Sequence, residues 1–355
     1  MPSPVARYAF INAKLRARIS KILPEEAVGA LVRAPSLIEA MQLLKSTAFS
    51  EVEAVYTATG DLKMAELALL ERELGLFVEV QRYVSGAPLA FVAALATRFE
   101  VENLKNVLRL WFDRAIRGRD IEARSAYLLR RQVVHRLDID ALLGAADIDR
   151  VAEILEGTPY AAIVRENGRG VATDKSLFAV EVALDKHYYR QLLVTAEHLD
   201  RRDQAVARRL IGVEIDMANI GWIVRLKSFY DLPVERALQS IIPSGWSVDE
   251  RTVRTAYASQ NVKQILDAIL RTGFSGLKGL LSTEAADSSS RLALVERVLA
   301  EIVLYEVRHV LGGYPFSIGI VLAYFVLAQS EIRRIVTILN AKYYNADQER
   351  IAGML

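Results

Sequence analysis

Acidic side chains recur along this sequence at a regular spacing, in two sets, and each member of the second set is followed by a residue that can form hydrogen bonds. The first set recurs with a period of about 115 residues and consists of Glu66, Glu181 and Glu296. A second acid follows each of these after about 35 residues, with a hydrogen-bonding residue three positions further on. These pairs are Glu100 with Asn103, Asp216 with Asn219, and Glu331 with Arg334. Such carboxylates could act in general acid–base catalysis, or they could order the protein interior.

The surroundings of these acids favour the structural interpretation. Residues three or four apart share one face of a helix, so Glu100 and Asn103 lie on a stripe with apolar residues such as Val107. A carboxylate on such a face needs a hydrogen-bonded or cationic partner, because burying it unpaired costs several kcal/mol. Arg109 and Arg225 lie on the opposite flank, and the first glutamate set supplies their expected partners. Since a catalytic site rarely needs three equal copies, we predict a structural polar network.

The same recurrence predicts a chain built from three similar units. Upstream of each first-set glutamate stands an aliphatic residue, then threonine and an aromatic, as in Leu44-Thr47-Phe49, Leu155-Thr158-Tyr160 and Ile269-Thr272-Phe274. The acid-bearing helix has a further copy at the start of the chain, marked by Asn12 and Arg18. A period of this length is the size of a small domain rather than of a solenoid repeat. We predict repeats at 1–98, 99–212 and 213–355, arranged with pseudo-threefold symmetry around an open centre or in a curved row.

Composition and periodicity predict an all-α protein. The chain has 355 residues, of which 52% are hydrophobic and 25% charged, with only 9 prolines and 19 glycines. Apolar residues recur at helical spacing almost throughout, and no run alternates as a strand would. The longest apolar run, 316–328, is well short of the ~20 residues that a membrane-spanning helix needs. It therefore predicts a buried core helix, and we expect no membrane-spanning segment.

The sequence also argues against several classes of function. There is no cysteine, which excludes disulfides and thiolate metal sites, and no amino-terminal apolar segment suggests secretion, so we expect a cytoplasmic protein. The net charge of +2 gives no field favouring nucleic acid. The four histidines lack metal-ligand spacing, and no phosphate-binding glycine motif occurs. We therefore expect no metal, no cofactor and no enzymatic activity.

Arginines gather in two segments of the sequence. The first segment contains Arg114, Arg117, Arg119, Arg124, Arg130, Arg131 and Arg136, and the second contains Arg201, Arg202, Arg208 and Arg209. Acids are interspersed in the first segment, which favours a solvated, ion-paired surface over a phosphate-binding track. Contact of one segment with an acidic protein or with lipid headgroups is the alternative.

Short motifs spread over the whole chain carry a family resemblance. They are 8–18 (YAFINAKLRAR), 99–109 (FEVENLKNVLR), 184–189 (LDKHYY), 214–219 (EIDMAN), 225–227 (RLK), 314–324 (YPFSIGIVLAY) and 328–333 (AQSEIR). Together they resemble a family of rotor proteins of V-type ATPases and ATP synthases, called the C subunit in archaea and bacteria and the d subunit in eukaryotes. The chain departs from the family pattern at Ile320, where proline is usual, and at Arg334 and Asn340, where asparagine and arginine are more common.

The resemblance implies a specific architecture and function. It implies an all-helical funnel of three similar domains, whose central cavity receives the foot of a coiled-coil shaft and whose wide side rests on the membrane proteolipid ring. A small shaft-associated subunit is a further implied partner. Such a protein would be a non-catalytic central-stalk rotor subunit, peripherally attached to the membrane, which transmits torque for H⁺ or Na⁺ transport coupled to ATP synthesis or hydrolysis. An all-helical enzyme with its site in the central cavity, or a generic helical scaffold, remain the alternatives.

Overall fold

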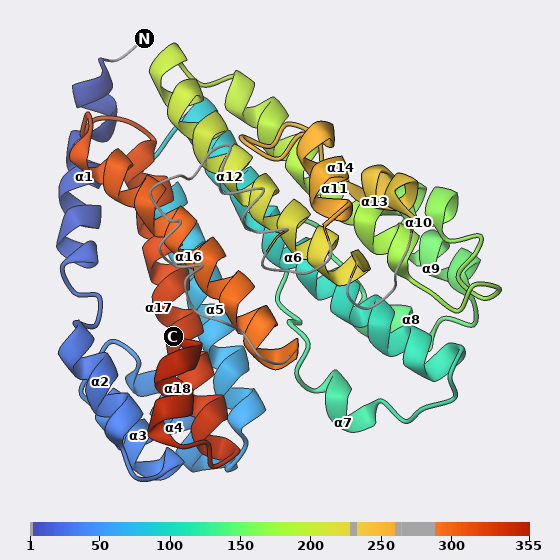
Figure 1. Cartoon of the computed structure of the whole chain (residues 1–355), viewed down its shortest axis with the longest axis horizontal. Coiled ribbons are helices and arrows are strands. Elements are labelled where there is room, and N and C mark those ends of the chain that lie inside the picture. The colour runs from blue at the N-terminus through green and yellow to red at the C-terminus, as the bar shows by residue number, and fades with distance from the viewer. Residues whose placement is uncertain (1–2, 228–232, 260–263, 265–287) are drawn as a thin grey trace. The chain divides into compact units, whose positions relative to one another are not determined.

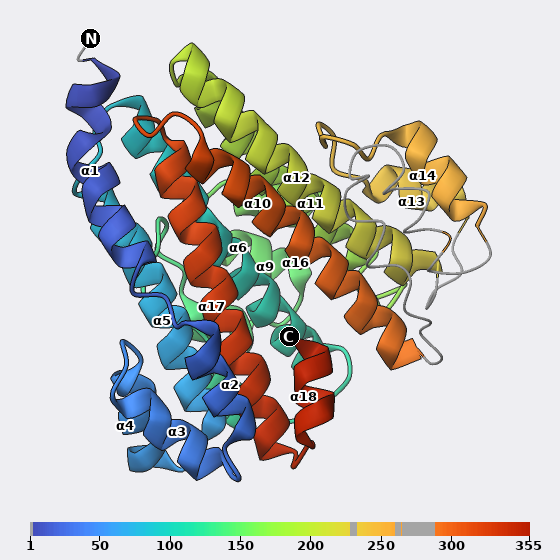
Figure 2. The same cartoon turned by 60° about the vertical axis from the view of Figure 1, so that its left-hand side comes forward.

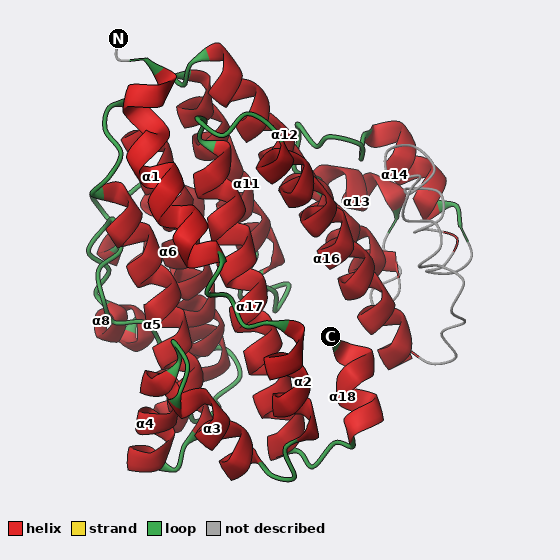
Figure 3. Cartoon of the chain, turned by 90° about the vertical axis from the view of Figure 1, so that its left-hand side faces the viewer, coloured by secondary structure: helices red, strands yellow, loops and turns green. Residues whose placement is uncertain are grey.

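The protein is built from α-helices joined by loops. The computed structural model describes residues 3–227, 233–259, 264 and 288–355, and at 225, 236, 288–297 and 299 it describes the backbone only. No strand occurs in these ranges, so the predicted all-α class is confirmed (Figure 3). The third threonine landmark, Ile269-Thr272-Phe274, lies outside the described residues, as do the side chains of Arg225 and Glu296.

The chain divides into two compact units, which are described separately. Unit 1 comprises residues 1–62 and 196–355, and unit 2 comprises residues 63–195. Unit 1 therefore contains both ends of the chain. Its helices are α1 (Pro4–Ile19), α2 (Glu25–Arg33), α3 (Leu37–Lys45), α4 (Ser50–Thr59), α12 (Arg201–Arg225), α13 (Val234–Ser240), α14 (Glu250–Tyr257), α16 (Ser288–Gly312), α17 (Gly319–Tyr343) and α18 (Gln348–Met354).

Helix α17 forms the centre of unit 1. It packs against α1, α2, α3, α12, α16 and α18, and two views show it running between α1 and α16 (Figures 1 and 2). Its first half is buried without interruption from Gly319 to Phe325, which confirms the core helix predicted from the apolar run. Gly319 is needed there because a Cβ would lie 2.6 Å from a Val310 methyl group. Among the residues that the structure describes, no helix has the length and apolarity to span a membrane.

Unit 2 is arranged around the long helix α6. Its helices are α5 (Leu62–Gln81), α6 (Ala87–Ala115), α7 (Glu122–Ser125), α8 (Ile139–Gly144), α9 (Ile148–Ile154), α10 (Tyr160–Asn167) and α11 (Phe178–Glu197). Helix α6 buries residues around most of its circumference, including Leu104, Leu108 and Trp111. It packs against α7 and α8, and Phe99 of α6 meets Phe77 of α5 edge-on at 5.1 Å. A helix buried on so many sides can hold polar residues only if each finds a partner inside the unit.

Local sequence explains where several helices begin and end. The side chains of Ser3, Asp200 and Asp138 each accept the backbone N–H three residues further on, which caps α1, α12 and α8. Short polar side chains are preferred at this position because they satisfy an N–H that the helix leaves unpaired. Helix α4 ends at Gly60, whose φ of 66° is the left-handed conformation that glycine adopts without strain.

Candidate functional site: carboxylate and asparagine clamps

In unit 2, Glu100 and Asn103 on α6 hold the loop 129–138, which lies between α7 and α8. The Asn103 amide donates to the Leu129 carbonyl (2.7 Å) and its carbonyl oxygen accepts the Leu129 N–H (2.9 Å). One Glu100 oxygen accepts the backbone N–H groups of Val134 (2.8 Å) and His135 (2.7 Å). The pair thus fixes a loop about 30 residues away in sequence, and we call it the Glu100 clamp.

The Glu100 carboxylate also contacts two side chains. Its second oxygen accepts the Tyr160 hydroxyl (2.8 Å) and lies 2.6 Å from the His135 Nδ1. Only 2% of the Glu100 side chain is exposed, so these groups replace the water that the carboxylate loses. Burial, together with the nearby Glu100 charge, raises the pKa of Tyr160, which keeps its hydroxyl protonated and donating.

In unit 1, Asp216 and Asn219 on α12 hold the loop 242–249 with the same geometry. Asn219 donates to the Ile242 carbonyl (2.9 Å) and accepts the Ile242 N–H (2.8 Å). Asp216 accepts the backbone N–H groups of Ser247 (2.6 Å) and Val248 (2.9 Å). We call this pair the Asp216 clamp. Both clamps use an acid and an asparagine three residues apart, because that spacing places them on one helix face.

The Asp216 carboxylate is more isolated than that of Glu100. Burial raises its pKa from 3.8 to about 6, which outweighs the opposing effect of the backbone N–H donors. Gly245 approaches it so closely that a Cβ at this position would lie 2.2 Å from an Asp216 oxygen. Glycine is therefore required for the loop to close over the acid.

The third predicted pair, Glu331 and Arg334 on α17, contacts the beginning of the chain. Glu331 accepts the backbone N–H of Leu23 (2.7 Å), and Arg334 forms a two-pronged ion pair with Glu25 (2.7 Å for both bonds). Burial of Glu331 is only partial. The acid at this position thus again holds a backbone segment, but here the segment comes from the other end of the sequence within unit 1.

The first glutamate set and the arginines are only partly brought together. Arg109 meets Glu181 at 2.6 Å, an arrangement that joins α6 to α11. Glu66 instead forms an ion pair with Lys63 on its own helix (2.6 Å). Glu296 and Arg225 have side chains outside the described residues. The polar network of unit 2 therefore includes Glu181 and Arg109, and the Glu66–Lys63 ion pair connects neighbouring turns of α5.

The threonine landmarks form the same local turn in both units. The Thr47 hydroxyl donates to the Leu44 carbonyl (2.7 Å) and accepts the Phe49 N–H (3.1 Å). Thr158 does the same with Leu155 (2.7 Å) and Tyr160 (3.2 Å). The aromatic residue that follows is buried in each case. The landmark is thus a side-chain-capped turn that places an aromatic ring in the core.

Sequence reasoning missed several polar contacts of the interior. Asp203, only 1% exposed, accepts the Tyr8 hydroxyl (2.5 Å) and the Ile318 N–H (2.8 Å), and so joins α1, α12 and the start of α17. Burial raises the pKa of both Asp203 and Tyr8. The spacing of the histidines suggests no special position for His135, but its ring contacts Glu100. Neither Asp203 nor His135 recurs between the repeats, so no periodic signal marks them.

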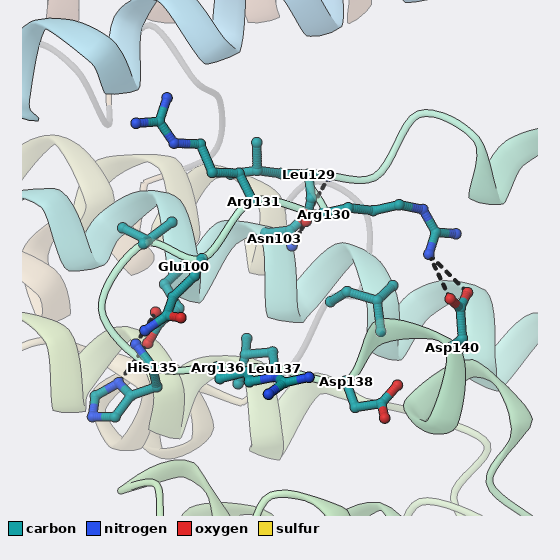
Figure 4. A pocket seen from close by; sticks show the side chains of 13 residues that line it. Glu100, Asn103, Leu129, Arg130, Arg131, His135, Arg136, Leu137, Asp138 and Asp140 are labelled. Carbon is teal, nitrogen blue, oxygen red and sulfur yellow. Dashed lines mark hydrogen bonds and ion pairs between the residues drawn. The ribbon is translucent and has the colours of Figure 1, made fainter.

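A cavity of about 510 Å³ lies beside the Glu100 clamp and is lined by residues of the loop and the start of α8. Figure 4 shows Arg130 directed to Asp140, with which it forms an ion pair (2.8 Å), and Arg131 directed away from Arg136. The labelled arginines do not converge on one point, and the Glu100 oxygens are occupied by the loop and by Tyr160. In the described part of the chain, no cluster of three or more acids and histidines could hold a metal ion. The acid holds structure here and has no free oxygen directed at a substrate.

These features define a helical protein whose buried acids hold its own loops. The sequence matches the family model described as "ATP synthase (C/AC39) subunit" over residues 11–354. The chain therefore belongs to the ATP synthase (C/AC39) subunit family, whose members are structural rather than catalytic parts of the complex. The enzymatic alternative and the generic scaffold are thereby replaced by a subunit of an A/V-type ATP synthase.

Curated relatives are similar over nearly their whole length. The C subunit of the A-type ATP synthase of Methanocaldococcus jannaschii is 22% identical, with 99% of this chain and 86% of the relative aligned. The protein of the same name from Pyrococcus horikoshii is 22% identical over 98% of this chain and 90% of its own. That from Haloquadratum walsbyi is 25% identical, with 96% of each chain aligned.

Proposed function

We propose that this chain is the central-stalk rotor subunit that links the shaft of the soluble ATPase head to the membrane proteolipid ring. The observation that carries the proposal is the family match over residues 11–354, together with relatives named as the C subunit of A-type ATP synthases. In this function the chain transmits torque, and so couples H⁺ or Na⁺ transport to ATP synthesis or hydrolysis. Its partners are the coiled-coil shaft subunit, the proteolipid ring and the small shaft-associated subunit.

The way unit 1 ties its two chain ends together supports a mechanical function. Tyr8 near one end is bonded to Asp203, and Leu23 and Glu25 are bonded to α17. The Lys342 ammonium near the other end donates to the Val32 carbonyl (2.6 Å) and to the Ala34 carbonyl at the end of α2. Torque would otherwise separate a terminal segment first, because chain ends are usually the least stable part of a domain.

The recurring clamps support three similar domains as the proposed architecture. We propose that the repeats at 1–98, 99–212 and 213–355 surround a central cavity as a pseudo-threefold funnel. In this arrangement the cavity receives the foot of the shaft, and the wide side rests on the cytoplasmic face of the ring. The equivalent contacts of Asn103 and Asn219, and of Thr47 and Thr158, are the support within the described residues. Close-packed helices suit this task because protein interiors are hardly compressible and transmit strain.

Deleting the gene and measuring coupling in inside-out membrane vesicles tests the proposal. The detached soluble head should hydrolyse ATP at the normal rate, whereas ATP-driven ion pumping should disappear. Pumping should return when the wild-type chain is supplied from a plasmid. Pumping that continues without the chain would show that it does not couple head and membrane.

A pull-down identifies the partners directly. The tagged chain, recovered from gently solubilised membranes, should bring down a small proteolipid and a coiled-coil shaft subunit. The matched control is the same tag on an unrelated helical protein of similar size. Recovery of the soluble head without any proteolipid would contradict a position between the head and the ring. The chain would then be a protein that binds the head alone.

A further inference from the structure

One end of unit 1 collects arginine side chains at the junction of three helices. The beginnings of α1 and α12 and the turn between α16 and α17 lie together there in two views (Figures 1 and 2). Arg7 of α1 pairs with Asp200, the capping residue of α12, at 2.8 Å. The Asp203 carboxylate joins Tyr8 to Ile318 in the same region. These contacts hold the beginnings of α1, α12 and α17 in a fixed arrangement.

Three exposed arginines at this end, together with Arg16 in the last turn of α1, have no carboxylate partner within the described ranges. Arg201 and Arg202 stand in the first turn of α12, and Arg308 stands near the end of α16. Within the ranges that the structure describes, no acid lies within ion-pairing distance of these three or of Arg16. Arg16 instead donates to the Leu311 carbonyl (3.1 Å). Their positive charge is thus not neutralised within the described structure.

An exposed aromatic residue orients one of these arginines. The Arg202 guanidinium lies 4.0 Å from the ring centre of Tyr314, which is 43% exposed and meets Phe316 edge-on. Stacking restricts the guanidinium, and a stacked guanidinium can still donate hydrogen bonds through its N–H groups. We call Arg16, Arg201, Arg202, Arg308 and Tyr314 the arginine end of unit 1.

The opposite end of unit 1 is richer in carboxylates within the described residues. Helices α2, α3, α4 and α18 lie there, away from the start of α12 (Figures 1 and 2). With the α18 capping residue they contain seven carboxylates, namely Glu25, Glu26, Glu39, Glu51, Glu53, Asp347 and Glu349, against Arg33, Lys45 and Arg350 of the same helices and Arg334 and Lys342 of α17, which contact α2. Among the described residues, carboxylates thus outnumber cations around these helices, whereas the other end carries unpaired arginines, and such a charge difference helps to orient a docking partner before contact.

We propose that the arginine end binds an acidic protein surface within the rotary complex. This inference rests on the proposed function, because it assigns one docking surface of the rotor adapter. All four cations are arginines, whose planar fork pairs with carboxylates through two bonds and loses less entropy than lysine. A surface that inserts into lipid would present a wide stripe of bulky apolar residues. At this end the large exposed hydrophobic side chains include Val5 of α1 and Tyr314 of the turn, and Tyr314 is itself stacked on Arg202.

Charge reversal at the start of α12 tests the inference. The variant carries Arg201→Glu with Arg202→Glu, since acids are well tolerated in the first turn of a helix. Its matched control carries Arg33→Glu with Lys45→Glu at the other end of unit 1, which changes the net charge equally. Unchanged thermal unfolding of both proteins establishes that they fold. Binding is measured by co-sedimentation with inside-out membranes stripped of the soluble head and of the endogenous subunit, and by pull-down of the soluble head with its shaft.

The α12 variant should bind one of the two partners about tenfold more weakly than the control at low ionic strength. Added salt should reduce this difference in affinity. Equal binding by variant and control would overturn the inference while leaving the proposed function intact. A wild-type chain that binds neither partner would overturn the proposed function and the inference with it. The wild-type chain could instead bind protein-free vesicles of phosphatidylcholine and phosphatidylglycerol, and the α12 variant could lose this binding. That result would overturn the inference and identify a lipid surface as the partner.

Discussion

The Glu100 clamp of unit 2 and the Asp216 clamp of unit 1 hold their loops with the same asparagine geometry but surround the acid differently. Glu100 accepts two backbone N–H groups and also contacts His135 and Tyr160. Asp216 accepts backbone N–H groups beneath Gly245, and burial raises its pKa to about 6. The comparison separates two tasks: the asparagine fixes the loop through the same two bonds in both units, and the acid is held by contacts that differ between the two loops.

This difference has a physical origin in the loops. Loop 129–138 supplies a histidine ring to its acid, and the landmark turn supplies the Tyr160 hydroxyl. Loop 242–249 offers backbone N–H groups, because its glycine brings the main chain against the carboxylate. A longer glutamate side chain reaches into a site with more donors, whereas a shorter aspartate is sealed by the loop. The same position in two repeats can therefore hold its loop with different contacts to the acid.

Removing the asparagines should have the largest effect on stability. Asn103→Leu and Asn219→Leu each leave a buried N–H and a buried carbonyl without partners, at Leu129 or at Ile242. Each should lower the free energy of unfolding by about 3–4 kcal/mol. Denaturant unfolding gives the size of the loss, and hydrogen exchange at the two loop amides locates it.

The control for the asparagine variants is Asn106→Leu, at an exposed position on the same helix as Asn103, where the change should be within about 0.5 kcal/mol. If either clamp variant were as stable as this control, its loop would be held by packing alone. A large loss in one unit only would show that the two clamps are not equivalent.

Asp216 should make the free energy of unfolding depend on pH. Because its folded-state pKa is raised from 3.8 to about 6, the folded protein binds a proton in a range where the unfolded chain has lost it. The contribution of this proton to the free energy of unfolding is fully present below about pH 4 and is lost as the pH rises through 6. The total loss is about 3 kcal/mol. Asp216→Asn should remove that slope from denaturant unfolding measured between pH 4 and 7. An unchanged slope in the variant would assign the pH dependence to another group.

The close approach of Gly245 gives a smaller expected effect. Gly245→Ala places a methyl group against the Asp216 carboxylate and should lower the free energy of unfolding by about 2 kcal/mol. Gly221→Ala in α12 is the matched control, because nothing lies within 4 Å of its Cβ position. That substitution should stabilise the helix by up to about 1 kcal/mol. Losses of equal size at both positions would show that the effect at Gly245 does not come from a clash with the Asp216 carboxylate.

The Arg109–Glu181 pair should contribute least. The Arg109 side chain is 51% exposed, so solvent screens the pair, and a double-mutant cycle with Arg109→Met and Glu181→Gln should give a coupling below about 1 kcal/mol. The pair of Arg150 and Glu153, in which both side chains are exposed, serves as reference and should give less still. A coupling of several kcal/mol would place the Arg109–Glu181 pair with the clamps as a main support of unit 2.

Much of the fold follows from the sequence because its signals are local. Helical periodicity predicts the all-α class, and the apolar run 316–328 predicts the buried first half of α17. The threonine landmarks lie within five residues, so their turn is also a local property. The acid and asparagine of each clamp share a helix face for the same reason, and their spacing alone identifies them as a pair.

The partners of that pair could be found only in the folded chain. Both clamps bind backbone N–H and C=O groups some 23–35 residues away in sequence, and every residue except proline presents such groups. No side-chain pattern therefore marks the loops. His135 and Asp203 were missed for a related reason, since each makes contacts unique to its position.

The sequence by itself determined that this protein is helical, that it repeats an acid and an asparagine at fixed spacing, and that it resembles a rotor subunit family. Only the tertiary structure decided what those residues hold, that both clamp acids are buried, and that arginines from separate helices gather at one end of unit 1. The reason is that spacing along a helix is set by backbone geometry. Burial and long-range pairing, in contrast, depend on which distant segments the folded chain brings together.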